Sequence, residues 1–136
     1  MNRDSFSLFT DGGARGNPGP AAIGGVLLDP TGKKIEEYAV YLGTATNNQA
    51  EYQALKHGLS VAKKHHITHL TCYLDSELVV RQMNREYKVK DPSLAKLFAE
   101  IYGSAVSFQK LTFVHIPREK NSQADTLVNK ALDEHS

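Results

Sequence analysis

The strongest constraint on the fold of this chain is a change in the spacing of its apolar residues. In the first third, apolar residues form three short runs with strand character, at residues 6–10, 21–28 and 35–42. From residue 48 to about residue 64 they are spaced for one face of a helix. Short connections make the three strands an antiparallel meander, and the change of period predicts a helix packed against it.

The remainder of the chain alternates between strand and helix patterns. Strands are expected at residues 70–74 and 108–116, and helices at residues 76–84, from Pro92 onward, and at residues 121–132. This order predicts an α/β fold in which a five-stranded mixed sheet carries helices on both faces. Because the 136 residues contain no linker-like stretch, we expect a single domain over residues 1–136.

Composition excludes several classes of protein. No stretch approaches the ~18 apolar residues of a membrane span, and the first residues, MNRDS, lack the basic and apolar regions of a signal peptide. The one cysteine, Cys72, cannot form an internal disulfide, which is typical of a reducing compartment. We therefore expect a cytoplasmic protein without membrane association. We also expect a monomer.

The charge of the chain is close to balanced. Sixteen Lys and Arg against fifteen Asp and Glu give a net charge of +1. A dedicated nucleic-acid-binding protein is often much more basic. Any binding of nucleic acid must therefore come from local clusters of charge, and it should be modest and sensitive to salt.

Four acidic residues stand at positions where sheets of this kind build sites. Asp11 closes the first strand and Asp75 ends the fourth, whereas Glu51 and Asp125 lie in the first turns of two helices. Carboxylates that are brought together repel one another, so such a cluster requires a cation. Oxygen ligands suit Mg²⁺ or Mn²⁺ rather than zinc, and two such ions support cleavage of a phosphodiester bond.

Each of the four acids also has a simpler structural interpretation. Glu51 follows an Asn by three residues and Asp125 follows a Ser by three residues, as in helix capping boxes. Asp11 fits an Asp-Gly turn, and Asp75 fits a cap of the helix after it. Taken singly, capping is the better interpretation of Glu51 and Asp125, and the two interpretations of Asp11 and Asp75 are equal. The joint pattern favours a shared site.

Four segments that contain these acids form an ordered series. They are TDGGARGNPGP at residues 10–20, TNNQAEYQAL at 46–55, YLDS at 73–76 followed by VVRQ at 79–82, and IPREKNSQAD at 116–125. In this order they resemble the motifs of type 1 ribonuclease H, over nearly the whole chain. Residues 85–91 are too few for the basic handle of many bacterial members. The resemblance is therefore to the compact branch of the family, which lacks the handle.

The resemblance implies the ribonuclease H fold, with the sheet order 3-2-1-4-5 and strands 1–3 antiparallel. It implies hydrolysis of the RNA strand of an RNA–DNA hybrid to 5′-phosphate and 3′-hydroxyl products by a two-metal-ion mechanism. Asp11, Glu51, Asp75 and Asp125 would then be the catalytic residues and the ligands of two Mg²⁺ ions, with Mn²⁺ as an expected substitute.

The resemblance also implies contacts with the hybrid. The expected nucleic-acid-binding residues are Gly12, Gly13, Asn17, Thr46, Asn47, Asn48 and Ser76. The glycine amides and the asparagines would meet 2′-hydroxyls or bases in the minor groove, where the 2′-hydroxyl distinguishes RNA from DNA. Thr46 would hold a phosphate of the DNA strand. Helix capping is the alternative for Asn47 and Asn48.

The chain departs from the family pattern before the last aspartate. Many members have a histidine in a flexible loop there, whereas His115 alternates with apolar residues in a predicted strand and precedes a proline. We expect Arg118 to bind phosphate and assist catalysis in its place. A guanidinium stays protonated, so Arg118 cannot act as a general base. Glu77 stands where the family often has Gln, which puts one base contact in doubt.

Three functions are open from the sequence. The four carboxylates favour an endonuclease that cuts hybrids. The missing handle and the missing loop histidine fit a module that binds hybrids but cuts them weakly or not at all. The Asn-rich segment is also compatible with a related nuclease that cuts double-stranded RNA.

Overall fold

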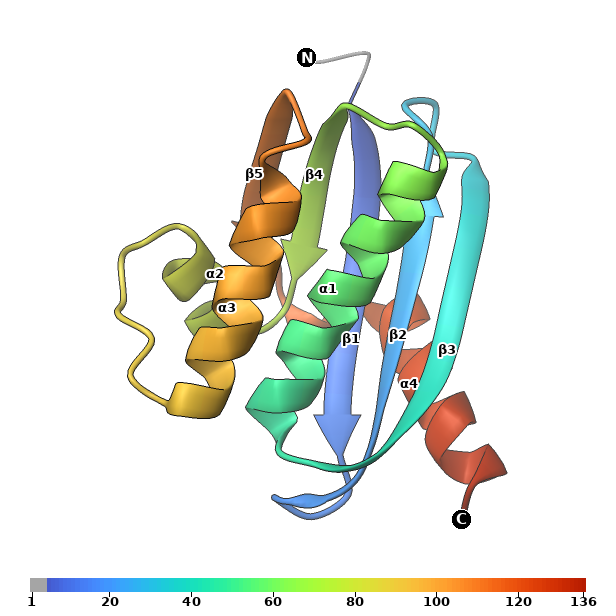
Figure 1. The fold of residues 1–136 in the computed structure, drawn as a ribbon. Helices are drawn as coiled ribbons and strands as arrows, with labels where there is room; N and C mark the ends of the chain where they lie inside the picture. Colours follow the sequence, from blue (N-terminus) through green and yellow to red (C-terminus); the bar gives the residue numbers. More distant parts are fainter. Residues whose placement is uncertain (1–4) are drawn as a thin grey trace.

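The computed structural model describes residues 5–136 and contains one sheet with helices on both faces (Figure 1). The strands are β1 (Phe6–Ala14), β2 (Gly19–Leu28), β3 (Lys34–Ala45), β4 (His69–Leu74) and β5 (Lys110–His115). The helices are α1 (Asn47–Lys64), α2 (Glu77–Met83), α3 (Pro92–Ala105), the 3₁₀ helix η1 (Arg118–Lys120) and α4 (Ser122–Glu134). The predicted order of elements is confirmed, with η1 as an addition. Residues 1–4, which belong to the segment inspected for a signal peptide, lie outside the described residues.

The sheet has the order β3-β2-β1-β4-β5, which confirms the order that the family resemblance implied. β1, β2 and β3 are antiparallel neighbours, whereas β4 runs parallel to β1 and β5 runs parallel to β4. The register pairs Thr10 of β1 with Leu74 of β4. The residues that follow them, Asp11 and Asp75, are therefore brought to the same place.

Helices cover the two faces of the sheet unequally. In Figure 1, α1 and α3 lie in front of the sheet and α4 lies behind it. The larger core lies between the sheet and the front helices and includes Leu8, Leu55 and Leu59. A smaller cluster that includes Ala22 and Val128 packs beneath α4. Within residues 5–136, no helix is both long enough and apolar enough to cross a membrane.

β1 continues further than the sequence predicted. The strand was expected to end at residue 10, with residues 11–20 as a turn. Instead, β1 and β2 stay paired up to the partners Ala14 and Ala21. Two adjacent glycines give this stretch the composition of a turn, but the continuous ladder with β2 holds them in extended conformation. The bend is thereby confined to residues 15–18.

Two glycines allow α1 and α4 to touch the sheet from opposite sides. A Cβ atom on Gly12 would lie 2.3 Å from the carbonyl carbon of Ala50 in α1. A Cβ atom on Gly24 would lie 2.6 Å from the carbonyl oxygen of Ala124 in α4. Both distances are shorter than van der Waals contact, so only a residue without a side chain permits these approaches.

Replacing Gly24 by alanine is expected to lower the free energy of unfolding by about 1–3 kcal/mol, because the added methyl group must displace the backbone of α4. Gly103→Ala is the matched control. Gly103 lies in α3, and apart from the backbone of its own helix no atom of the described residues lies within 4 Å of the added carbon, so helix propensity should raise stability by roughly 0.5–1 kcal/mol. Urea unfolding measures both changes, and equal stabilities of the two variants would contradict the close packing of α4.

Candidate active site

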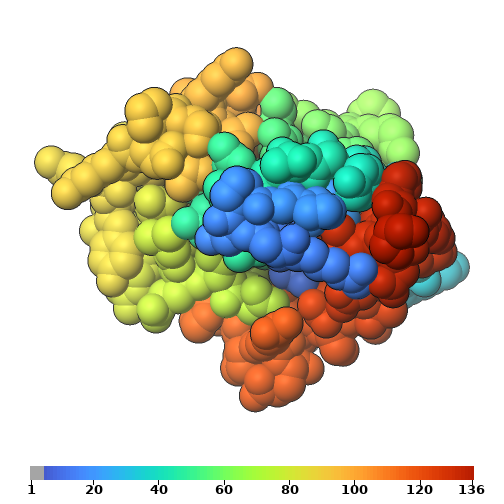
Figure 2. Space-filling model, turned by 90° about the horizontal axis from the view of Figure 1, so that it is seen from below, coloured from blue at the N-terminus to red at the C-terminus, as the bar shows by residue number. Residues whose placement is uncertain are grey.

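Three acidic side chains converge where β1, β4 and α1 meet. Asp11 comes from β1, Glu51 from α1, and Asp75 from the position directly after β4. One carboxylate oxygen of each lies within 4.8 Å of the others. With Asp125 of α4 they line one open hollow. In Figure 2 the early residues (blue) are bordered by residues near the start of α1 (teal) and by the C-terminal helix (red).

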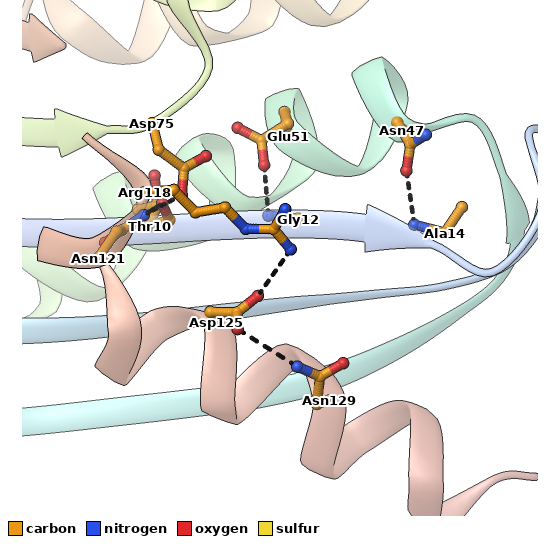
Figure 3. A network of polar contacts seen from close by, with 10 residues as sticks. All are labelled: Thr10, Gly12, Ala14, Asn47, Glu51, Asp75, Arg118, Asn121, Asp125 and Asn129. Carbon is orange, nitrogen blue, oxygen red and sulfur yellow. Dashed lines mark hydrogen bonds and ion pairs between the residues drawn. The ribbon is translucent and has the colours of Figure 1, made fainter. Parts of the chain in front are cut away.

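The backbone beside Asp11 fixes the position of Glu51. The N–H of Gly12 donates a hydrogen bond to Glu51 Oε1 at 2.7 Å (Figure 3). This bond forms because Gly12 has no side chain to hold α1 away from the strand. Glu51 is only 6% exposed and its second oxygen, Oε2, has no hydrogen-bond partner among the described residues. A buried oxygen without a partner is costly unless a ligand contacts it.

Burial and repulsion make this carboxylate group unfavourable when all its members are charged. Burial, with the charges of Asp75 and Asp125, raises the pKa of Asp11 to about 7, although the adjacent carboxyl group of Glu51 acts in the opposite direction. Burial and the neighbouring Asp11 raise the pKa of Glu51 well above its ordinary value. A divalent cation would neutralise this charge and provide a partner for Glu51 Oε2. The residues therefore fit a site for a divalent metal with oxygen ligands.

Asp125 approaches the same hollow from α4, on the other face of the sheet. It does not belong to the group of three whose oxygens lie within 4.8 Å. Its Oδ2 accepts a hydrogen bond from Asn129 Nδ2 at 3.4 Å, and its Oδ1 lies 4.0 Å from Arg118 Nη2 (Figure 3). The side chain of Arg118 is 83% exposed, so this ion pair is weak and the guanidinium is accessible at the edge of the hollow.

Comparison with known proteins supplies the family. The model of the family described as "Reverse transcriptase-like" matches residues 9–131. The crystal structure of RNase H1 from the archaeon Halobacterium salinarum matches with a TM-score of 0.93 at 37% identity, over 96% of this chain and 98% of that one. This chain belongs to the ribonuclease H family.

Two further relatives extend the comparison. LC11-RNase H1, isolated from compost, was solved in complex with an RNA/DNA hybrid and matches with a TM-score of 0.92 at 46% identity, over 96% of this chain and 98% of that one. The bifunctional protein Rv2228c of Mycobacterium tuberculosis is 42% identical over 127 residues, which are 93% of this chain and 35% of the relative. The chain therefore spans about a third of the length of the curated relatives at this identity.

In this member of the ribonuclease H family, the capping of α1 does not involve Glu51. Thr46 is the N-cap: its Oγ1 accepts a hydrogen bond from the N–H of Gln49 at 3.1 Å. In return, Gln49 Oε1 accepts one from the N–H of Thr46 at 2.9 Å. The predicted capping box between Asn48 and Glu51 is therefore wrong, because the helix begins two residues earlier than that box requires.

The simpler interpretations of the other three acids are wrong as well. Asp11 lies inside β1 and not in an Asp-Gly turn. Ser76, rather than Asp75, accepts the capping hydrogen bond at the start of α2. At α4 the N-cap is Asn121, and no side chain makes a capping hydrogen bond there, so Asp125 is not part of a capping box. None of the four carboxylates is used by the structural motif that was its alternative.

The residues predicted to contact nucleic acid divide into two groups. Those that line the hollow are Gly12, Gly13, Asn47, Asn48 and Ser76. Asn17 and Thr46 are not part of its lining in the portion of the chain that the structure describes. Both are nevertheless next to Asn47, which lines the hollow. Thr46 precedes Asn47 in the chain, and Asn17 Oδ1 accepts a hydrogen bond from the N–H of Asn47 at 3.0 Å. Asn47 Oδ1 in turn accepts one from the N–H of Ala14 at 2.9 Å. The loop after β1 is thus bonded to the start of α1.

Sequence reasoning missed two polar residues of the site. Asn129 lies one helical turn after Asp125, a spacing that could have indicated contact between the two side chains. Asn121 is of a residue type that often caps helices, but its side chain accepts no hydrogen bond from α4 and donates one to Asp75 instead. His115 ends β5, an edge strand, and lies outside the lining of the hollow among the described residues, in agreement with its expected strand position.

Asp11→Asn is expected to raise the melting temperature of the metal-free protein at pH 7.5 by roughly 4–8 °C, which corresponds to about 1–2 kcal/mol. The pKa of Asp11 is raised from 3.8 to about 7 in the folded state, so folding becomes less favourable as the pH rises between these values. The gain of the variant should therefore shrink toward pH 4.

Thermal unfolding in EDTA across this pH range tests the expectation. Asp29→Asn is the control, because hydrogen bonds from Thr31 and Lys33 lower the pKa of Asp29, and the loss of its charge should not stabilise the protein. If the melting temperature of Asp11→Asn at pH 7.5 is at or below that of the unmodified protein, the charge of Asp11 does not destabilise the folded state.

Proposed function

We propose that this chain is a metal-dependent endonuclease that hydrolyses the RNA strand of RNA–DNA hybrids to 5′-phosphate and 3′-hydroxyl products. The observation that carries the proposal is the convergence of Asp11, Glu51 and Asp75 at one partly buried point, where their charges are unfavourable without a cation. Membership of the ribonuclease H family supports the reaction, and the RNA/DNA hybrid bound to LC11-RNase H1 supports the substrate.

The proposed metal ligands are Asp11, Glu51, Asp75 and Asp125. Their oxygens suit Mg²⁺, with two ions when substrate is bound and with Mn²⁺ able to substitute. Such ions supply activation of the attacking water and stabilisation of the leaving oxygen. Asp125 lines the same hollow from the opposite face of the sheet and would complete the ligand set from that side.

The remaining proposed roles belong to residues around the carboxylates. The amide of Gly12 is already bonded to Glu51, so this glycine contributes by letting the backbone and a substrate approach closely. Asn48 and Ser76, which line the hollow, would contact 2′-hydroxyls. The side-chain oxygen Oδ1 of Asn47 already accepts a hydrogen bond from the N–H of Ala14, so its side-chain nitrogen Nδ2 would be the donor to the hybrid.

The two residues beyond the lining have proposed roles at the edges of the hybrid. Thr46, beside the start of α1, would contact a phosphate of the DNA strand, and Asn17 would meet the minor groove. Both are held against α1 by the hydrogen bonds of its first turn, which supports contact from a fixed position. We further propose that residues 1–136 act as one monomeric domain in the cytoplasm without membrane association.

The decisive experiment is cleavage of a strand-labelled RNA–DNA hybrid in parallel with EDTA, Mg²⁺ and Mn²⁺, beside matched RNA–RNA and DNA–DNA duplexes. Cutting of the RNA strand of the hybrid alone, and only with metal, is the expected result. Binding of the hybrid without cleavage under either metal would instead identify a hybrid-binding module. Cleavage of the RNA–RNA duplex at a similar rate would identify a nuclease with broader substrates.

In this assay Asp11→Asn should lower the cleavage rate by roughly a thousandfold or more, because the substitution removes a charge from the centre of the ligand set. Asp29→Asn, in the turn between β2 and β3, should cut at the rate of the unmodified protein. Full activity of Asp11→Asn would refute its assignment as a metal ligand.

Arg118→Ala should lower the cleavage rate by roughly 10- to 100-fold with little change in melting temperature, because this exposed guanidinium at the hollow would bind a phosphate of the substrate. Lys120→Ala is the matched control. It removes a charge from the same 3₁₀ helix at a position that is not part of the lining of the carboxylate hollow in the described chain. Equal effects of the two variants would reduce the role of Arg118 to general attraction of the substrate.

A further inference from the structure

Asn121 is a buried polar residue whose side chain the fold does not use in the expected way. It stands between η1 and α4 as the N-cap of α4, yet its side chain makes no capping hydrogen bond. It is 1% exposed, and its carbonyl oxygen Oδ1 has no hydrogen-bond partner among residues 5–136. Because an unpaired buried carbonyl lowers stability, the needs of α4 alone do not explain an asparagine here.

The amide nitrogen of Asn121 joins two neighbours in the carboxylate group. It donates to the backbone oxygen of Thr10 at 2.8 Å and to Asp75 Oδ2 at 3.1 Å (Figure 3). Thr10 directly precedes Asp11, so one NH₂ group connects the backbone at Asp11 with the carboxylate of Asp75. Both partners are acceptors, and a flipped amide would place an oxygen against two oxygens. The chemistry of the contacts therefore fixes the orientation of the amide.

The backbone of Asn121 reaches two further parts of the site. Its carbonyl oxygen accepts a hydrogen bond from the N–H of Asp125 at 3.1 Å, and its own N–H donates to the carbonyl oxygen of Arg118 at 2.9 Å. A single residue thus contacts segments that carry three of the four acids and the exposed arginine. These segments come from β1, the end of β4, η1 and α4.

The donated hydrogen bond also orients Asp75. One carboxylate oxygen of Asp75 lies within 4.8 Å of an oxygen of Asp11. A donor on Oδ2 of Asp75 restricts the rotation of that carboxylate. A ligand that is already oriented binds a cation more tightly than one that must be ordered on binding.

We propose that Asn121 is a positioning residue of the metal site: its amide fixes the spacing of Asp11 and Asp75 and holds Asp75 in one orientation toward the cation. This inference rests on the proposed function of the carboxylates as metal ligands. It assigns to Asn121 an effect on metal affinity that exceeds its effect on the stability of the fold.

The test is calorimetric titration of Mn²⁺ into the metal-free protein, which requires no substrate and no turnover. Asn121→Leu keeps the approximate volume of the side chain and removes the donor. We expect its dissociation constant for Mn²⁺ to rise at least roughly tenfold. Cleavage of the hybrid by this variant should recover in part as Mn²⁺ is increased, since the carboxylates themselves are intact.

Gln82→Met is the matched control for the loss of a buried amide. Gln82 is 5% exposed, accepts from the hydroxyl of Tyr52 at 2.5 Å and donates to the carbonyl oxygen of Lys88 at 3.3 Å, away from the carboxylates. This variant should lose thermal stability and keep the Mn²⁺ affinity of the unmodified protein. If Asn121→Leu does not fold, Asn121→Ser replaces it. Its short hydroxyl cannot span both acceptors, and it should also weaken Mn²⁺ binding.

The outcomes distinguish the positioning role of Asn121 from the existence of the carboxylate metal site. Asn121 variants that lose stability but retain the Mn²⁺ affinity of the unmodified protein would overturn the positioning role and leave the proposed enzyme intact. An unmodified protein that binds no Mn²⁺ would overturn the carboxylate metal site itself, and the role of Asn121 with it. A selective loss of affinity in the Asn121 variants, with Gln82→Met unchanged, is the result we expect.

Discussion

The close contact of two helices with the centre of the sheet is the constraint on which the rest of this structure depends. At Gly12 the backbone of β1 touches α1, and at Gly24, the β2 partner of Asp11, the sheet touches α4. Each contact brings an acidic side chain, Glu51 or Asp125, toward the aspartate of the central strand. The site is therefore built by backbone proximity, and the side chains that would have prevented it are absent.

The same arrangement places an unfavourable charge distribution in an otherwise well-packed protein. The core on the α1 side contains many fully buried aliphatic side chains, and it holds Glu51 and Asp11 in positions where burial raises the pKa of both. A site of this kind is organised before a ligand arrives, because folding has already brought the charges together. The binding of a cation then gains from the removal of repulsion as well as from new contacts.

Because its motifs follow one another in the order of a known family, the sequence was sufficient for the order of strands and helices and for the prediction that the four acids meet at one hollow. It was not sufficient for local contacts that depend on partners distant in the chain. Residues 11–14 have the composition of a turn, and only pairing with β2 makes them a strand. Asn48 fits a capping box as well as Thr46 does, and only the start of α1 decides between them. The role of Asn121 depends on a backbone oxygen 111 residues away.

The hydrogen bonds among Ala14, Asn17 and Asn47 have a consequence for recognition by shape. These bonds order the loop when the chain folds. The binding of a partner therefore does not have to offset the loss of conformational entropy in the loop, which costs on the order of 1–2 kcal/mol per residue. A net charge of +1 supplies little long-range attraction. A partner would therefore gain affinity by fitting the shape of the preformed loop and helix start, more than by attraction to the net charge.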